Sequence, residues 1–131
     1  MNGLQLADGL LERIRAQGGR YDERAYLFVL AAVEYLQSGL EVRRHVSGGE
    51  LAWACHGFAV EQFGLMAETV LAHWGVMRTE DFGRIVYTLV AVDLLVTQPG
   101  DRESDFAAVY DFADVFRRQY SWQGIPGTAT G

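Results

Sequence analysis

The chain has 131 residues, of which half are apolar and about a fifth are charged. This balance is typical of one packed globular domain and excludes an intrinsically disordered chain, which lacks the apolar residues for a core. The net charge is −6, and all eleven basic residues are arginines. The window 79–114 holds eight acids and two arginines, an excess equal to that of the whole chain. Because phosphate contact needs clustered positive charge, nucleic-acid binding is disfavoured.

The sequence shows no feature of a secreted or membrane protein. Residues 1–17 lack a basic leader followed by an apolar run. The longest uncharged apolar run, 25–33, is about half as long as a bilayer span requires. The single cysteine, Cys55, cannot form an internal disulfide. We therefore expect a protein without a membrane segment, located in the reducing cytoplasm.

Apolar residues at helical spacing, bounded by capping residues, predict a mainly α fold. Asp22 is a suitable N-cap, and the segment Ser47 to Glu50 has the pattern of a capping box. Thr79 is expected to cap a helix whose stretch 85–92 is buried on most sides. The predicted helices cover Leu4 to Gln17, 23–38, Gly48 to Phe63, Leu65 to Trp74, a segment from Thr79 to Leu94 or Leu95, and Phe112 to Gln119.

The remaining segments predict two small β features. Residues 41–46 favour a short edge strand or an extended connection, and a turn at Pro99-Gly100 favours a small hairpin within 94–110. The fold expected is a compact domain of five to six helices over residues 1–122, with a flexible tail at 123–131. Its element order is similar to a winged helix, in which 80–93 would be the recognition helix and 96–106 the wing. Likeness of fold does not establish function.

Several short motifs support a resemblance over residues 21–120. They are Arg44-His45-Val46-Ser47-Gly48, Gln62-Phe63-Gly64, Trp74-Gly75, Thr79-Glu80-Asp81-Phe82-Gly83 and Tyr110-Asp111-Phe112. In combination they resemble an uncharacterised family of short bacterial proteins found chiefly in the Planctomycetes and Verrucomicrobia group. The resemblance implies no activity. The chain departs from the family pattern at Asp93, where a glycine is expected before the paired leucines.

The residues that carry metal or covalent chemistry form no recognisable constellation. No glutamate has a histidine three residues later, and Cys55 and His56 are adjacent, which points them about 100 degrees apart on a helix. The acidic stretch 101–105 matches half of a calcium loop, but phenylalanines stand at its sixth and twelfth positions. We therefore predict no catalytic residue, metal or cofactor. Convergence of acids in space would favour an enzyme or metal site instead; the acids are Asp81, Asp93, Asp105 and Asp111.

One candidate anion site lies at the start of the third predicted helix. Gly48 and Gly49 offer backbone N–H groups there, and Arg43 and Arg44 stand just before them. The alternative is a glycine pair that only loosens the first turn of the helix.

Two apolar helix faces are candidates for contact with a partner. Trp53, His56 and Val60 form a second face on the third predicted helix, and Leu27 and Tyr35 do so on the second. Neighbouring helices could equally cover both faces. The function expected is a non-enzymatic module for protein interaction or regulation, with self-association as one form. The alternatives are a winged-helix-like regulator that binds nucleic acid and an enzyme or metal-binding protein that uses Asp and His residues.

Overall fold

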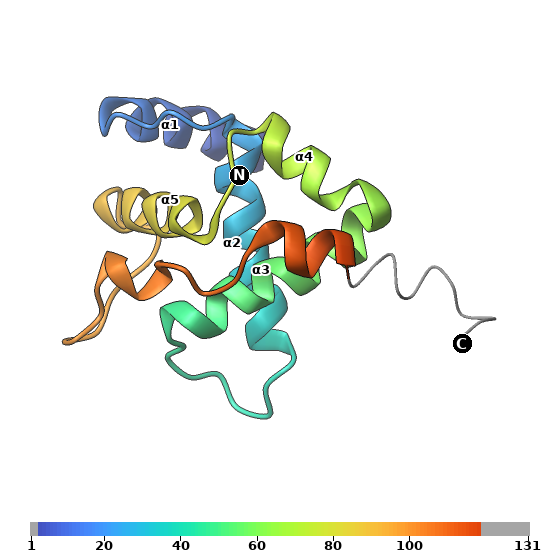
Figure 1. Cartoon of the computed structure of the whole chain (residues 1–131). Helices are drawn as coiled ribbons and strands as arrows, with labels where there is room; N and C mark the ends of the chain where they lie inside the picture. Colours follow the sequence, from blue (N-terminus) through green and yellow to red (C-terminus); the bar gives the residue numbers. More distant parts are fainter. Residues whose placement is uncertain (1–2, 119–131) are drawn as a thin grey trace.

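Helices dominate residues 3–118, which are the residues that the computed structural model describes (Figure 1). The prediction of a mainly helical fold is confirmed, and this part of the chain contains no β-strand. The predicted tail, 123–131, lies outside the described residues. None of the described helices is long and apolar enough to cross a membrane. In chain order the elements are α1 (Gly3–Ala16), α2 (Glu23–Ser38), α3 (Gly48–Phe63), the 3₁₀ turn η1 (Gly64–Met66), α4 (Ala67–His73), α5 (Thr79–Ala91), the 3₁₀ turn η2 (Glu103–Phe106) and the π-helical η3 (Ala113–Arg118).

The helices α2 and α3 begin where their capping residues predict. The Asp22 carboxylate accepts the backbone N–H of Arg24 at 2.9 Å. The Ser47 hydroxyl accepts the N–H of Glu50 at 3.1 Å, and the Glu50 carboxylate accepts the N–H of Ser47 at 2.9 Å, so the predicted capping box is present. The Arg44 guanidinium, together with that backbone N–H, holds the pKa of Glu50 at about 2.

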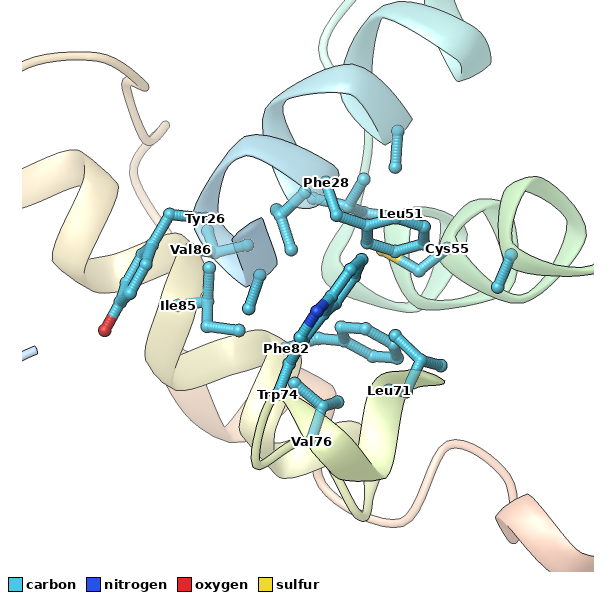
Figure 2. Close-up of a cluster of buried hydrophobic side chains, with 14 of the residues drawn as sticks. Tyr26, Phe28, Leu51, Cys55, Leu71, Trp74, Val76, Phe82, Ile85 and Val86 are labelled. Carbon is cyan, nitrogen blue, oxygen red and sulfur yellow. The ribbon is translucent and has the colours of Figure 1, made fainter. Parts of the chain in front are cut away.

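The core lies where α2, α3, α4 and α5 meet. Figure 2 shows side chains from these four helices converging on Phe82 of α5, which is fully buried. Phe28 and Trp74 meet there with ring centroids 5.7 Å apart. Within 85–92 only Ala91 is exposed, so the predicted burial of this stretch is confirmed. Each large apolar side chain in such a core contributes about 1.5–3 kcal/mol to stability.

The start of α5 differs from the prediction, because Thr79 does not cap it. Arg78 occupies the N-cap position, and the Asp81 carboxylate accepts the N–H groups of Met77 at 2.8 Å and Arg78 at 3.1 Å. The buried Thr79 hydroxyl instead donates to the carbonyl of Phe106 at 2.6 Å and accepts the N–H of Val109 at 3.2 Å. Thr79 therefore ties α5 to a segment far along the chain.

Of the two forms expected for residues 41–46, the short strand is absent from the described structure, and a connection without regular structure is present. The side-chain amide of Gln37 supplies the hydrogen bonds that a neighbouring strand would give: its Nε2 donates to the carbonyl of Arg44 at 2.6 Å, and its Oε1 accepts the N–H of Arg44 at 3.2 Å. Residues 41–46 thus form an extended connection held by α2.

The hairpin predicted at 94–110 is also wrong, and turns take its place in this part of the chain. The Asp101 carboxylate accepts the N–H of Gln98 at 2.8 Å, and that of Asp105 accepts the N–H of Arg102 at 3.0 Å. These acids satisfy the backbone locally, so no ladder of hydrogen bonds forms. A winged helix would need both the strand and the wing, and the described residues provide neither.

Phe106 fastens the 94–106 segment between α3 and α5. Its side chain is 2% exposed. A β-carbon on Gly48 would lie 3.0 Å from the Phe106 ring, and one on Gly83 would lie 2.9 Å from the Phe106 β-carbon. Both glycines are therefore required by the close approach of this side chain.

Replacing Gly83→Ala should destabilise the protein by about 1–3 kcal/mol, because the added methyl group overlaps the Phe106 side chain. Gly49→Ala is the matched control. Gly49 is also helical, its nearest neighbouring atom lies 3.9 Å from the added carbon, and alanine should stabilise α3 by up to about 1 kcal/mol. Chemical denaturation of both variants measures the difference. Equal stabilities would contradict the proposed contact.

The helix α5 ends at Ala91, earlier than the predicted Leu94 or Leu95, because Asp93 adopts a left-handed conformation with φ 65°. The N–H of Leu94 then bonds to the carbonyl of Leu89 at 2.9 Å, as in a glycine-ended helix. Glycine is the residue type that adopts this left-handed conformation most readily, so Asp93 carries a steric cost at the helix end.

Asp93→Gly should stabilise the protein by about 0.5–1 kcal/mol, because glycine adopts this conformation without steric cost. The ion pair lost with Arg13 spans 3.9 Å between exposed groups and contributes little. The control Ala31→Gly, at an exposed position in the middle of α2, should cost about 1 kcal/mol. Thermal and denaturant unfolding of both variants test this, and a loss of stability in Asp93→Gly would contradict it.

Candidate functional site

A cavity of about 390 Å³ opens between α2, α3, α5 and the 94–106 segment. This volume is within the range of small-ligand and side-chain pockets. Val96, which lines it, is 85% exposed, so the cavity is open to solvent there. The other aliphatic and phenylalanine residues that line it come from these segments and from the α2–α3 connection, and they are Val33, Val46, Leu51, Val86, Leu94, Leu95 and Phe106.

Charged side chains of both signs line the same cavity. His45 and Asp101 both line the cavity and approach to 3.2 Å, which joins the α2–α3 connection to the 94–106 segment. The N–H of Gln98 lowers the pKa of Asp101, and His45 adds to this effect. Arg44 also lines the cavity. A ligand with an apolar centre and polar ends would therefore meet matching groups.

The predicted anion site is already occupied by the protein's own groups. Arg43 forms a two-pronged ion pair with Glu34 at 3.0 Å, and Arg44 pairs with Glu50 at 2.7 Å. Gly48 lies against Phe106. Gly49 belongs to the same first turn, and the Glu50 carboxylate beside it accepts the N–H of Ser47. The structure thus places the four candidates near one another but pairs both arginines internally.

Residues 109–116 cover much of the predicted partner face on α3 (Figure 1). The Trp53 and Tyr110 rings are 4.4 Å apart, and those of His56 and Phe116 are 5.0 Å apart. The Tyr110 hydroxyl donates to the backbone of α3 at 2.7 Å. Val60 is half-buried, and Trp53 stays 46% exposed. The alternative that neighbouring segments cover this face therefore applies to most of it.

The predicted face on α2 is only partly free. Tyr35 packs against Phe58 of α3, with ring centroids 5.1 Å apart, and is half-buried. Leu27 is 42% exposed. Of the five candidate partner residues, Trp53 and Leu27 are exposed and the other three are half-buried.

The acids that could have formed an enzyme or metal centre have separate partners. Asp81 caps α5, Asp105 closes the turn before η2, and Asp111 accepts the N–H of Ala113 at 2.7 Å. Asp93 is at the end of α5. Among the described residues, no three His, Cys, Asp or Glu side chains are placed to hold a metal ion. Cys55 is fully buried, and burial raises the pKa of its thiol.

The cavity was not predicted from the sequence. Its lining comes from residues 33 to 106, and no local pattern connects them. One feature of the sequence could have indicated the cavity: the pair Leu94-Leu95 continues an apolar run beyond the end of α5. Two large apolar side chains are therefore left outside regular structure.

His56 should make the stability of the protein depend on pH. Its Nε2 atom is buried without a hydrogen-bond partner in the described structure. Burial lowers the pKa of His56, although a hydrogen bond to the backbone of Val115 acts in the opposite direction. The unfolded chain therefore binds a proton first, near pH 6.5, and stability should fall as the pH drops from about 6.5 through the folded pKa.

His56→Phe should reduce this loss of stability, because phenylalanine cannot be protonated and leaves no unpaired polar atom. Denaturation at a series of pH values measures it. His73→Gln, which removes an exposed histidine, is the control and should retain the sensitivity that arises from His56. Parallel pH profiles for His56→Phe and the unmodified protein would contradict the prediction.

Comparisons of this chain with models of protein families, with curated proteins and with solved structures found no match. Conclusions about its role therefore depend on its own cavities, charges and contacts.

Proposed function

We propose that this protein is a non-enzymatic binding module and that the cavity between α2, α3 and α5 receives an apolar group of a partner protein. The observation that carries the proposal is the cavity of about 390 Å³ with an apolar lining and polar groups around it. Protein interfaces commonly combine a buried apolar centre with a polar rim. One or two apolar side chains of a partner would fill such a space.

The polar groups favour a peptide segment as the occupant. Thr97 and Gln98 line the cavity together, and their side chains offer both donors and acceptors. A peptide presents backbone N–H and carbonyl groups on either side of an apolar side chain, so it can pair with donors and acceptors at once. The partner can be another protein or a second copy of this chain.

Nucleic acid is a less suitable partner for this region. Asp101 and Asp105 line the cavity together with Arg44 and Arg102. The lining therefore offers phosphate groups no excess of positive charge. The winged-helix-like alternative also depends on strands that the described residues lack.

The proposal predicts that Val96→Asp weakens peptide binding about tenfold or more, because a carboxylate at the cavity must be desolvated by an apolar ligand. Short peptides selected from a random displayed library would be measured by fluorescence polarisation. Val42→Asp is the matched control, since Val42 is 74% exposed and does not line the cavity. It should leave the affinity unchanged within about twofold.

Three measurements separate the outcomes. Failure to select any peptide, or equal affinity for Val96→Asp and the unmodified protein, would refute the proposal. Amide shifts on binding should appear at Leu51, Val86 and Leu94. Light scattering distinguishes the partners, because an oligomer that dissociates in Val96→Asp identifies a second copy as the occupant.

A further inference from the structure

A second concave site lies beside the start of α5 and collects positive charge. It has a volume of about 380 Å³, and three of the residues that line it are Arg20, Arg78 and Arg84. Tyr21 and Asp81 also line it. It shares no residue with the cavity assigned to a partner protein. In a chain of net charge −6, three guanidinium groups in one hollow need a physical explanation.

Asp81 cannot neutralise all three arginines. Its carboxylate accepts the Tyr21 hydroxyl at 2.6 Å and an Arg84 N–H at 2.8 Å. It also accepts the backbone N–H groups of Met77 and Arg78. A carboxylate has about four acceptor positions, and these four donors use them. The side chains of Arg20 and Arg78 therefore leave the site with two positive charges in excess.

Most other arginines in the described part of the chain pair with a carboxylate, unlike Arg20 and Arg78. Among arginines with described side chains, only Arg20, Arg78 and Arg102 have no carboxylate of the described residues within 4.0 Å, and Arg102 lies outside this site. The Arg20 guanidinium lies 6.0 Å from the centre of the Tyr21 ring. The ion pairs elsewhere are Arg13–Asp93, Arg15–Glu23, Arg24–Asp22, Arg43–Glu34, Arg44–Glu50, Arg84–Asp81 and Arg117–Glu68.

The geometry points to a binding site for a phosphate monoester, held by Arg20 and Arg78 and positioned by Arg84. A phosphate monoester carries about two negative charges near pH 7, which matches the excess. One planar guanidinium group can donate two parallel N–H hydrogen bonds to two oxygens of the same phosphate. Binding would give these two arginines the anionic partner that the described protein does not supply.

The neighbouring space indicates what the phosphate is attached to. A hollow of about 300 Å³ continues past Arg20, Tyr21 and Arg84 and is lined by polar groups that include Gln17 and Glu103. Glu103 would repel a second phosphate but can accept hydroxyl or amide hydrogens. The ligand is therefore a single phosphate on a neutral, hydrogen-bonding group, as in a sugar phosphate or a phosphorylated serine in a peptide.

Calorimetric titration with three probes tests the site: inorganic phosphate, glucose 6-phosphate and a short phosphoserine peptide. At least one ester should bind at a single site and more tightly than inorganic phosphate. Arg20→Gln and Arg78→Gln should each weaken binding about tenfold, the usual effect of losing one charge-assisted contact. Tighter binding of the sugar phosphate identifies a small metabolite as the ligand, and tighter binding of the peptide identifies a phosphorylated protein.

Two control variants make the test specific. Arg102 also lacks a carboxylate partner among the described residues, but it lies outside this site. Arg102→Gln should therefore not change phosphate binding. Val96→Asp should also leave it unchanged, so failure of the partner-protein proposal is distinguishable from failure of this one. Arg20 and Arg78 are exposed, and a melting curve confirms that their variants fold. The inference is overturned if no phosphate probe binds at low salt, or if Arg102→Gln weakens binding as much as Arg78→Gln.

Discussion

The placement of Phe106 between α3 and α5 is the contact on which much of the structure depends. Its ring lies against Gly48, its β-carbon lies against Gly83, and its carbonyl accepts the buried hydroxyl of Thr79. These contacts hold the 94–106 segment as one wall of the cavity. They also fix the position from which residues 107–112 continue over α3 to η3. Removing the anchor would therefore open the cavity and release the cover of α3 together.

The starts of α2 and α3 follow from the sequence because their signals are local. Asp22 and the Ser47–Glu50 pair satisfy amides within three residues, so they can be identified without knowing the rest of the fold. Thr79 has the same residue type as a cap, but its partners are 27 and 30 residues away. Local preference cannot reveal such distant partners, so the role of Thr79 is visible only in the folded structure.

The candidate sites show the same division between local and long-range information. Helical spacing correctly separates Trp53 and His56 from the buried stripe of α3, yet it cannot show that Tyr110 and Phe116 return to cover them. Arg43 and Arg44 were sound anion candidates by composition, but acids from α2 and α3 neutralise them. Arg20 and Arg78 attract no attention in the sequence because 58 positions separate them. Only the packing of the α1–α2 turn beside α5 brings them together.

The helix α5 connects the two proposed sites. Its Val86 lines the apolar cavity, its Arg84 lines the basic site, and Tyr87 lines both the apolar cavity and the hollow that extends the basic site. The apolar face of this helix is buried in the core, and Asp81 caps its start. The spacing between the sites is therefore set by the same packing that fixes Phe106. A ligand in either site would contact a helix whose position the whole fold determines, so binding would add to the stability of the core.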